Sequence, residues 1–182
     1  MSCSLKLNRG NRPDQTVMGR KEPEAGSAPQ SPGLAVRIPP PLWLVISALI
    51  AFGIHLGIRT PVISRSLPLA IALAIAGIGL AMWGGATFSR AGTELHPASE
   101  TNAKLVTNGP FRFTRNPMYS GVILVSLGIA FFFGTLPFFA ATVLLLLLIN
   151  AAFIPFEEAK MERQYGAGFR AYKSRVRRWG LL

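Results

Sequence analysis

Cysteine and histidine, the most common zinc ligands, are scarce in this sequence. Cys3 is the only cysteine among 182 residues, which excludes an intramolecular disulfide and a cysteine-based zinc site. The two histidines, His55 and His96, lie far apart in different kinds of segment, so we expect no metal site. The phosphate-binding patterns GxGxxG and GxxxxGKS/T are also absent, which leaves the sequence without a nucleotide loop of either type.

Acidic residues are also few, with 8 Asp and Glu against 19 Lys and Arg and a formal net charge of +11. Such an excess is typical of nucleic-acid-binding proteins, but here the cations flank long apolar runs. Six precede the first run, four lie between the second and third, seven follow the last, and Arg59 and Arg65 complete the set. The positive-inside rule then places both termini on the cytoplasmic side of the inner membrane. We therefore expect no nucleic-acid partner.

The apolar residues form blocks that indicate an all-α integral membrane protein with about four transmembrane helices. A helix needs about 20 apolar residues to cross a bilayer, and the third block is somewhat short. Gly, Pro, Ser and charged residues dominate residues 1–40, which predicts a disordered cytoplasmic tail ahead of a membrane domain at residues 41–182. The lipid bilayer is thus the first expected partner. The predicted spans are residues 42–58, 67–88, 119–134 and 136–156.

A polar, turn-rich segment, LVTNGPFRFTRNPMYSG at residues 105–121, leads into the third apolar block. Pro117 fits the first turn of a helix, where its missing N–H costs no hydrogen bond. The free N–H groups and the positive dipole end of that helix would lie beside Arg112 and Arg115. This combination favours the binding of an anionic group at the start of the helix.

An acid pair, Glu157 and Glu158, follows the fourth block and begins a basic, amphipathic tail at residues 157–179. A basic amphipathic helix is typical of a segment that lies on an anionic membrane surface. That interpretation explains the cations and the tryptophan near the end of the tail, but not the acid pair. The residues it explains are Arg175, Arg177, Arg178 and Trp179.

The two polar regions should meet in the folded protein. If the third and fourth blocks form a helical hairpin, the start of the third helix and the end of the fourth lie at the same membrane depth. Cations, carboxylates, aromatic rings and helix-start amides would then converge on the cytoplasmic face, as at a ligand site.

These motifs resemble the isoprenylcysteine carboxyl methyltransferase and phospholipid methyltransferase superfamily. The resemblance rests on residues 105–121, on the acid pair, and on the closing pattern Tyr165-Gly166, Phe169, Tyr172 and Arg175-Val176. It extends over about residues 88–179. Its members are integral membrane enzymes that use S-adenosylmethionine, so the resemblance implies methyl transfer from that cofactor to a lipophilic or small-molecule acceptor.

Carried over by position, the resemblance implies two overlapping sets of site residues. The expected cofactor-binding residues are Leu105, Val106, Gly109, Phe111, Arg115, Asn116, Pro117, Tyr119, Glu157, Glu158 and Tyr172. The expected catalytic residues are Arg115, Asn116, Tyr119, Glu158 and Arg175. Asn116 stands where the family's best-known form has histidine, and an asparagine cannot titrate near neutral pH. A mechanism that needs a histidine base at this position is therefore excluded.

Two other functions remain open from the sequence. One is a membrane reductase of related fold that uses NADPH, and the other is a non-catalytic membrane protein whose charged loop anchors it. Within the methyltransferase interpretation the acceptor is an isoprenylcysteine-like carboxylate, a phospholipid amine or a hydrophobic thiol, and the sequence does not choose among them.

Overall fold

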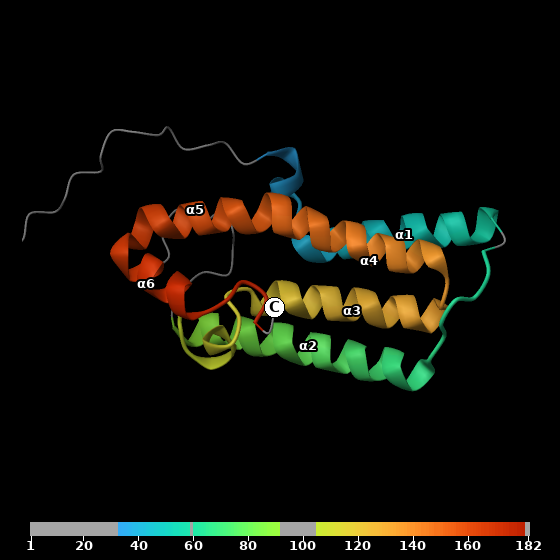
Figure 1. Cartoon of the computed structure of the whole chain (residues 1–182), viewed down its shortest axis with the longest axis horizontal. Coiled ribbons are helices and arrows are strands. Elements are labelled where there is room, and N and C mark those ends of the chain that lie inside the picture. The colour runs from blue at the N-terminus through green and yellow to red at the C-terminus, as the bar shows by residue number, and fades with distance from the viewer. Residues whose placement is uncertain (1–32, 59, 92–104, 181–182) are drawn as a thin grey trace, which may run out of the picture. The chain divides into compact units, whose positions relative to one another are not determined.

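The computed structural model describes residues 33–58, 60–91 and 105–180, and this part of the chain is helical (Figure 1). Within these ranges no strand forms, and the β-type pairing recorded is one isolated bridge between Val62 and Thr135. The predicted disordered tail lies outside the described residues as far as residue 32. Its last part is ordered, because Leu34–Arg37 forms a 3-10 turn, η1, whose Ala35 carbonyl accepts a hydrogen bond from Trp43.

Two apolar helices come first. Helix α1 covers Pro40–Gly57 and α2 covers Leu67–Arg90, and both carry a proline in the first turn, where a proline costs no hydrogen bond. Both are long and apolar enough to cross a membrane. They match the first two predicted spans to within two residues at each end.

The third and fourth spans form the predicted hairpin. Helix α3 covers Pro117–Phe133, and α4 covers Leu136–Leu148. From Leu136 the chain stays helical to Tyr165, long enough to cross a membrane, whereas α3 is a shorter apolar helix of 17 residues. At 1.5 Å per residue α3 is about 26 Å long, close to the hydrocarbon thickness of a bilayer. The expectation of an all-α membrane protein with about four spans is confirmed.

The helix of the fourth span continues without a break past the end of the predicted apolar run. A π-helical turn, η3 at Ile149–Phe153, joins α4 directly to α5 at Ile154–Tyr165, and Figure 1 shows one continuous ribbon. A proline inside a helix clashes with the carbonyl four residues earlier, and the wider π turn just before Pro155 relieves that clash. The break falls instead at Gly166, with φ of 50°, before α6 at Ala167–Arg175.

Small residues let α2 and α3 pack closely. A Cβ added at Gly77 would lie 2.6 Å from the Gly121 carbonyl oxygen, and one at Gly84 would lie 3.0 Å from the Met118 side chain. Such contacts are typical of helix pairs in membranes, where small residues allow the backbones to approach. Gly79, on the same helix, faces open space.

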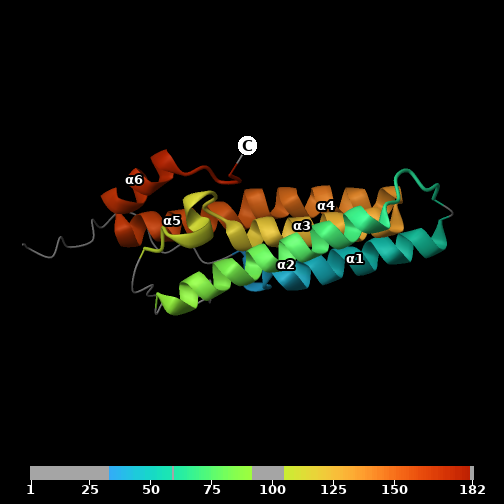
Figure 2. The ribbon, with the colours of Figure 1, turned by 90° about the horizontal axis from the view of Figure 1, so that it is seen from below.

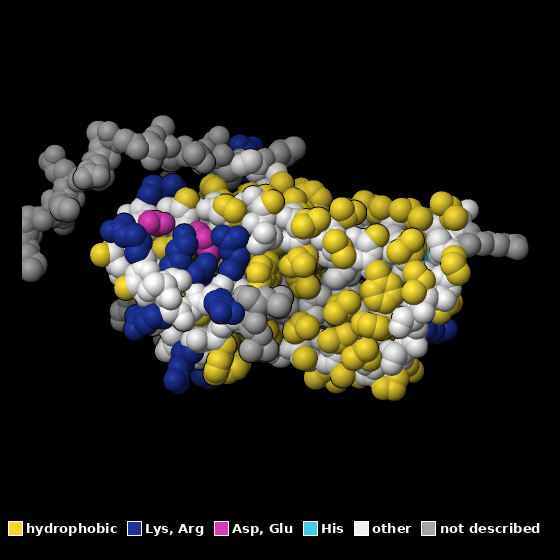
Figure 3. All heavy atoms as spheres, in the orientation of Figure 1, with side chains coloured by type: hydrophobic (Ala, Val, Ile, Leu, Met, Phe, Trp, Pro, Cys, Tyr) yellow, Lys and Arg dark blue, Asp and Glu magenta, His cyan; other side chains and the backbone are white. Residues whose placement is uncertain are grey.

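The outer surface of the helices is apolar, as lipid contact requires. On α2 the exposed side chains include Ile71, Ile75 and Met82, and Figure 3 shows apolar side chains along the helices. The five leucines at residues 144–148 do not all face outward: Leu144 is 65% exposed, whereas Leu145 is buried at 2%.

Candidate functional site

The segment that leads into α3 is shaped by a tight turn. Gly109 begins a 3-10 turn, η2 at Gly109–Arg112, with φ of 58°, and a Cβ there would lie 2.8 Å from the Thr87 hydroxyl oxygen. A residue with a side chain would therefore meet both backbone strain and a clash. The turn buries Phe111, whose ring packs edge-on against Phe88 with centroids 4.8 Å apart.

Asn116 is the residue before the first turn of α3, and its side chain contacts the C-terminal tail. Its Nδ2 donates to the Arg178 carbonyl oxygen at 3.1 Å, and the Thr114 hydroxyl donates to the same oxygen at 2.8 Å. The same Thr114 hydroxyl accepts from the backbone N–H of Asn116 at 3.1 Å. The amide of Asn116 thus holds backbone from the far end of the chain.

Arg115 joins three parts of the structure. Its Nη2 donates to Glu158 Oε1 at 2.8 Å, and both side chains are about nine-tenths buried. Its Nη1 donates to the carbonyl oxygens of Lys173 and Val176, each at 2.9 Å, at the end of α6. A cation there also complements the negative end of the helix dipole. The remaining Nε is buried without a partner within the described part of the chain.

Glu158 is the centre of a cluster of cations. Besides Arg115, it accepts from Arg178 through Nη2 at 3.0 Å and Nε at 3.3 Å, and Lys173 Nζ lies 3.4 Å from Oε2. A buried carboxylate is stable only when such partners replace the lost water. Among the residues described, Glu158 has its charge compensated by three cations from three segments.

Glu157, one position earlier, has a different partner. The Tyr119 hydroxyl donates to Glu157 Oε1 at 2.5 Å. Side chains near the start of a helix lean toward its N-terminus, so the phenol of Tyr119 extends past the beginning of α3 toward α5. Its ring packs edge-on against Phe153 with centroids 6.1 Å apart. Adjacent helical positions point about 100° apart, which is why the two glutamates meet different partners.

The apolar face of α6 is buried within the protein. Tyr172 donates through its hydroxyl to the Phe111 carbonyl oxygen at 2.8 Å, and its ring lies beside Phe169. Burial raises the pKa of Tyr172 to about 12, so it remains a neutral donor at physiological pH. The opposite face carries the exposed cations Arg170 and Arg175. Lys and Arg side chains cover this end of the molecule in Figure 3.

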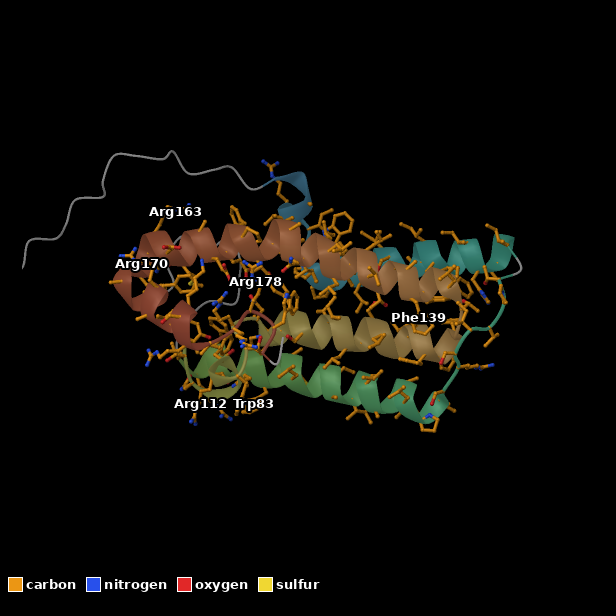
Figure 4. All side chains as sticks on the ribbon, in the orientation of Figure 1. Trp83, Arg112, Phe139, Arg163, Arg170 and Arg178 are labelled. Carbon is orange, nitrogen blue, oxygen red and sulfur yellow. The ribbon has the colours of Figure 1, made fainter. Side chains whose placement is uncertain are left out.

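Three contributors to this cluster were not predicted as site residues: Asn150, Arg178 and Trp179. Asn150 Oδ1, in the π turn, accepts from Arg178 Nη1 at 3.1 Å and from Trp179 Nε1 at 3.2 Å. The amphipathic pattern of the tail predicts Arg178 and Trp179 on the membrane surface with the other tail cations. The structure turns both inward, and Figure 4 shows Arg178 beside α5, away from the outward-pointing Arg163 and Arg170. A lone asparagine within an apolar run was the available signal.

The structure brings together most of the predicted residues, but not all. Arg175 is exposed, and its Nε donates to the Ala171 carbonyl oxygen within its own helix at 3.1 Å, so it does not join the cluster. Pro117 packs under Gly84, while Leu105 is half-buried and Val106 buried. No group of three metal-ligating side chains occurs in the described ranges. The residues that meet around the start of α3 are Phe111, Arg115, Asn116, Tyr119, Glu157, Glu158 and Tyr172.

Comparison with known proteins gives one family. Residues 66–168, more than half of the chain, match the family model described as phospholipid methyltransferase. The matched region covers α2 to α5 and leaves out α1 and nearly all of α6. No curated protein and no solved structure matches the chain.

Proposed function

The chain belongs to the phospholipid methyltransferase family, and we propose that it transfers a methyl group from S-adenosylmethionine to a lipophilic acceptor at the cytoplasmic membrane face. The observation that carries this proposal is the division of the acid pair. Glu158 is neutralised by cations of the protein, whereas Glu157 is held by the neutral hydroxyl of Tyr119. Glu157, which has Lys160 as its nearby cation, is the acid of the pair that we assign to the ligand.

The residues present suit the cofactor's functional groups. S-adenosylmethionine carries an amine, a carboxylate, ribose hydroxyls and an adenine ring. The Glu157 carboxylate suits the amine or the hydroxyls. The Nε of Arg115, which has no partner among the described residues, is a donor suited to the carboxylate. Phe111 and Tyr119 provide aromatic rings nearby. When bound, the cofactor supplies an activated methyl group, so the protein has mainly to orient it and exclude water.

The acceptor is expected to come from the bilayer. The cluster lies where α3 begins and α5 continues the fourth span, so a lipid headgroup would meet it at the membrane surface. An isoprenylcysteine-like carboxylate, a phospholipid amine and a hydrophobic thiol all fit a site whose described residues include no histidine. Among these, the family match favours the phospholipid amine.

Cofactor binding by the purified protein tests this function against its two alternatives. We expect saturable binding of S-adenosylmethionine, and transfer of its labelled methyl group into a lipid extract. Glu157→Gln removes the charge and keeps the shape, and should weaken cofactor binding roughly ten- to a hundred-fold, the effect of losing a charged hydrogen bond. Glu162→Gln is the matched control on the same helix, because Glu162 lies in weak, half-exposed ion pairs.

The alternatives predict different titrations. Binding of NADPH without binding of S-adenosylmethionine would identify a reductase, and binding of neither would indicate a non-catalytic protein. If Glu157→Gln binds the cofactor like the parent protein, the assignment of Glu157 is wrong.

The proposed orientation has its own test. With both termini cytoplasmic, Ser64 in the α1–α2 link lies outside the cell, and Ser174 in α6 lies inside. In a Cys3→Ser background, Ser64→Cys should react with an impermeant thiol reagent in intact cells, and Ser174→Cys should react only after lysis. The reverse pattern of labelling would overturn the orientation.

A further inference from the structure

The five residues after α6, residues 176–180, form a strap that crosses the start of α3 (Figures 1 and 2). The backbone N–H of Arg115 donates to the Arg177 carbonyl oxygen at 3.0 Å. The next carbonyl, that of Arg178, accepts from Thr114 and Asn116. Three hydrogen bonds from the segment before α3 therefore fix the position of this strap by its backbone, independently of its side chains.

Two adjacent arginines of the strap have opposite surroundings. The strap begins in an extended conformation at Val176, with φ of −119° and ψ of 128°, and successive side chains of an extended chain point to opposite sides. Arg177 is exposed, whereas Arg178 points inward and contacts both Glu158 and Asn150. Equal in charge and neighbours in sequence, they differ in what they touch.

Arg178 is placed to set the rotation of α5 about its axis. It donates hydrogen bonds to both carboxylate oxygens of Glu158. Through Nη1 it also donates to the side-chain oxygen of Asn150, two turns earlier in the same continuous helix. Trp179 adds a second bond to the Asn150 oxygen. Because Glu157 and Glu158 are about 100° apart on this helix, fixing the direction of Glu158 also fixes the direction of Glu157 toward Tyr119.

We propose that Arg178 is a positioning residue for the acid pair: by holding Glu158 and Asn150, it keeps the Glu157 carboxylate directed at the ligand side of the site. The strap, which the family match does not include, is then part of the site. In the tests that measure cofactor affinity, this inference rests on the proposed function. In the tests that measure thermal stability, it rests on the structure alone.

The neighbouring arginines provide a matched pair of variants. Arg178→Gln should weaken binding of S-adenosylmethionine by roughly ten-fold, the scale of a lost charge-assisted hydrogen bond. Arg177→Gln removes the same charge from the adjacent position and should leave affinity within about two-fold. Arg178→Lys should fall between the parent and Arg178→Gln, because lysine keeps the charge but loses the planar fork. Equal effects of Arg177→Gln and Arg178→Gln would overturn the proposal.

Positioning predicts a specific form of non-additivity. In a Glu157→Gln background, Arg178→Gln should lower cofactor affinity by no more than about two-fold further, because the carboxylate that it orients has already lost its charge. Fully additive losses of affinity would mean that Arg178 does not act through Glu157, and would refute the proposal.

Two further measurements test the positioning role of Arg178 even if the variants are unstable or the parent protein fails to bind the cofactor. Asn150→Leu keeps the branched shape of the side chain and removes the acceptor of Arg178, and it should weaken cofactor binding in the same direction as Arg178→Gln. Thermal melting of Arg178→Gln, Glu158→Gln and the double variant should be non-additive, whether or not S-adenosylmethionine binds. A parent that does not bind would refute the proposed function alone, whereas additive melting shifts would refute the positioning role.

Discussion

The two ends of the helical bundle are built from different interactions. At one end the α3–α4 turn meets the α1–α2 link through the backbone: the N–H groups of Ile63 and Ser64 donate to the Gly134 carbonyl oxygen at 2.7 and 3.2 Å, and Ser66 donates to Phe131 at 3.1 Å. At the other end, charged and polar side chains join α3, α5 and the strap.

The two ends should therefore tolerate different kinds of substitution. Backbone hydrogen bonds do not depend on side-chain identity, so the turn end should respond to changes of backbone conformation. A buried ion cluster depends on every charge within it, so the site end should respond to isosteric changes that leave the backbone alone. The three variants below test this contrast.

Glu158→Gln should have the largest effect on stability. The guanidinium groups of Arg115 and Arg178 would then face a neutral amide in place of a carboxylate. Breaking a buried ion pair typically costs about 3–5 kcal/mol. We expect a large fall in melting temperature in detergent. Glu162→Gln, which removes only half-exposed ion pairs, should cost less than about 1 kcal/mol. Similar melting of the two variants would show that the Glu158 cluster contributes little.

Gly134→Ala should have the next largest effect, and only on stability. Gly134 has φ of 72°, and an added Cβ would lie 2.7 Å from the Arg65 Cβ, so strain and crowding together should cost about 1–3 kcal/mol. Cofactor affinity should stay within about two-fold, because the turn lies at the far end of α3. Gly79→Ala is the control, since Gly79 faces open space in α2. A loss of affinity in Gly134→Ala would contradict the independence of the two ends.

Tyr172→Phe should have the smallest effect, about 1 kcal/mol for a lost hydrogen bond to the Phe111 carbonyl oxygen. It should also alter the response to alkali. Burial raises the pKa of Tyr172 to about 12, so the folded protein favours the neutral form of this side chain. The resulting contribution to the free energy of unfolding is complete below the unfolded pKa of about 10. It is lost as pH rises through about 12. Melting at pH 8 and pH 11 should show that loss in the parent and less of it in the variant. Identical pH dependence in both proteins would rule out this role for Tyr172.

Part of the molecule could be predicted because it depends on local sequence. The four spans follow from runs of apolar residues, and the start of α3 follows from Pro117. That Arg115, Tyr119 and the acid pair share one end of the bundle follows from the hairpin alone. Each of these features depends on the length of an apolar run or on a single backbone constraint, and both are visible in the sequence.

The tertiary structure alone decided how these residues are paired. Helical geometry separates adjacent side chains, but the sequence gives no reason to assign Glu158 rather than Glu157 to the cations, or Arg178 rather than Arg177 to Glu158. The partners depend on the rotation of α5, which follows the π turn before Pro155, and on the path of the strap across α3. Both are settled by contacts between segments distant in sequence, and such contacts leave no periodic pattern in the chain.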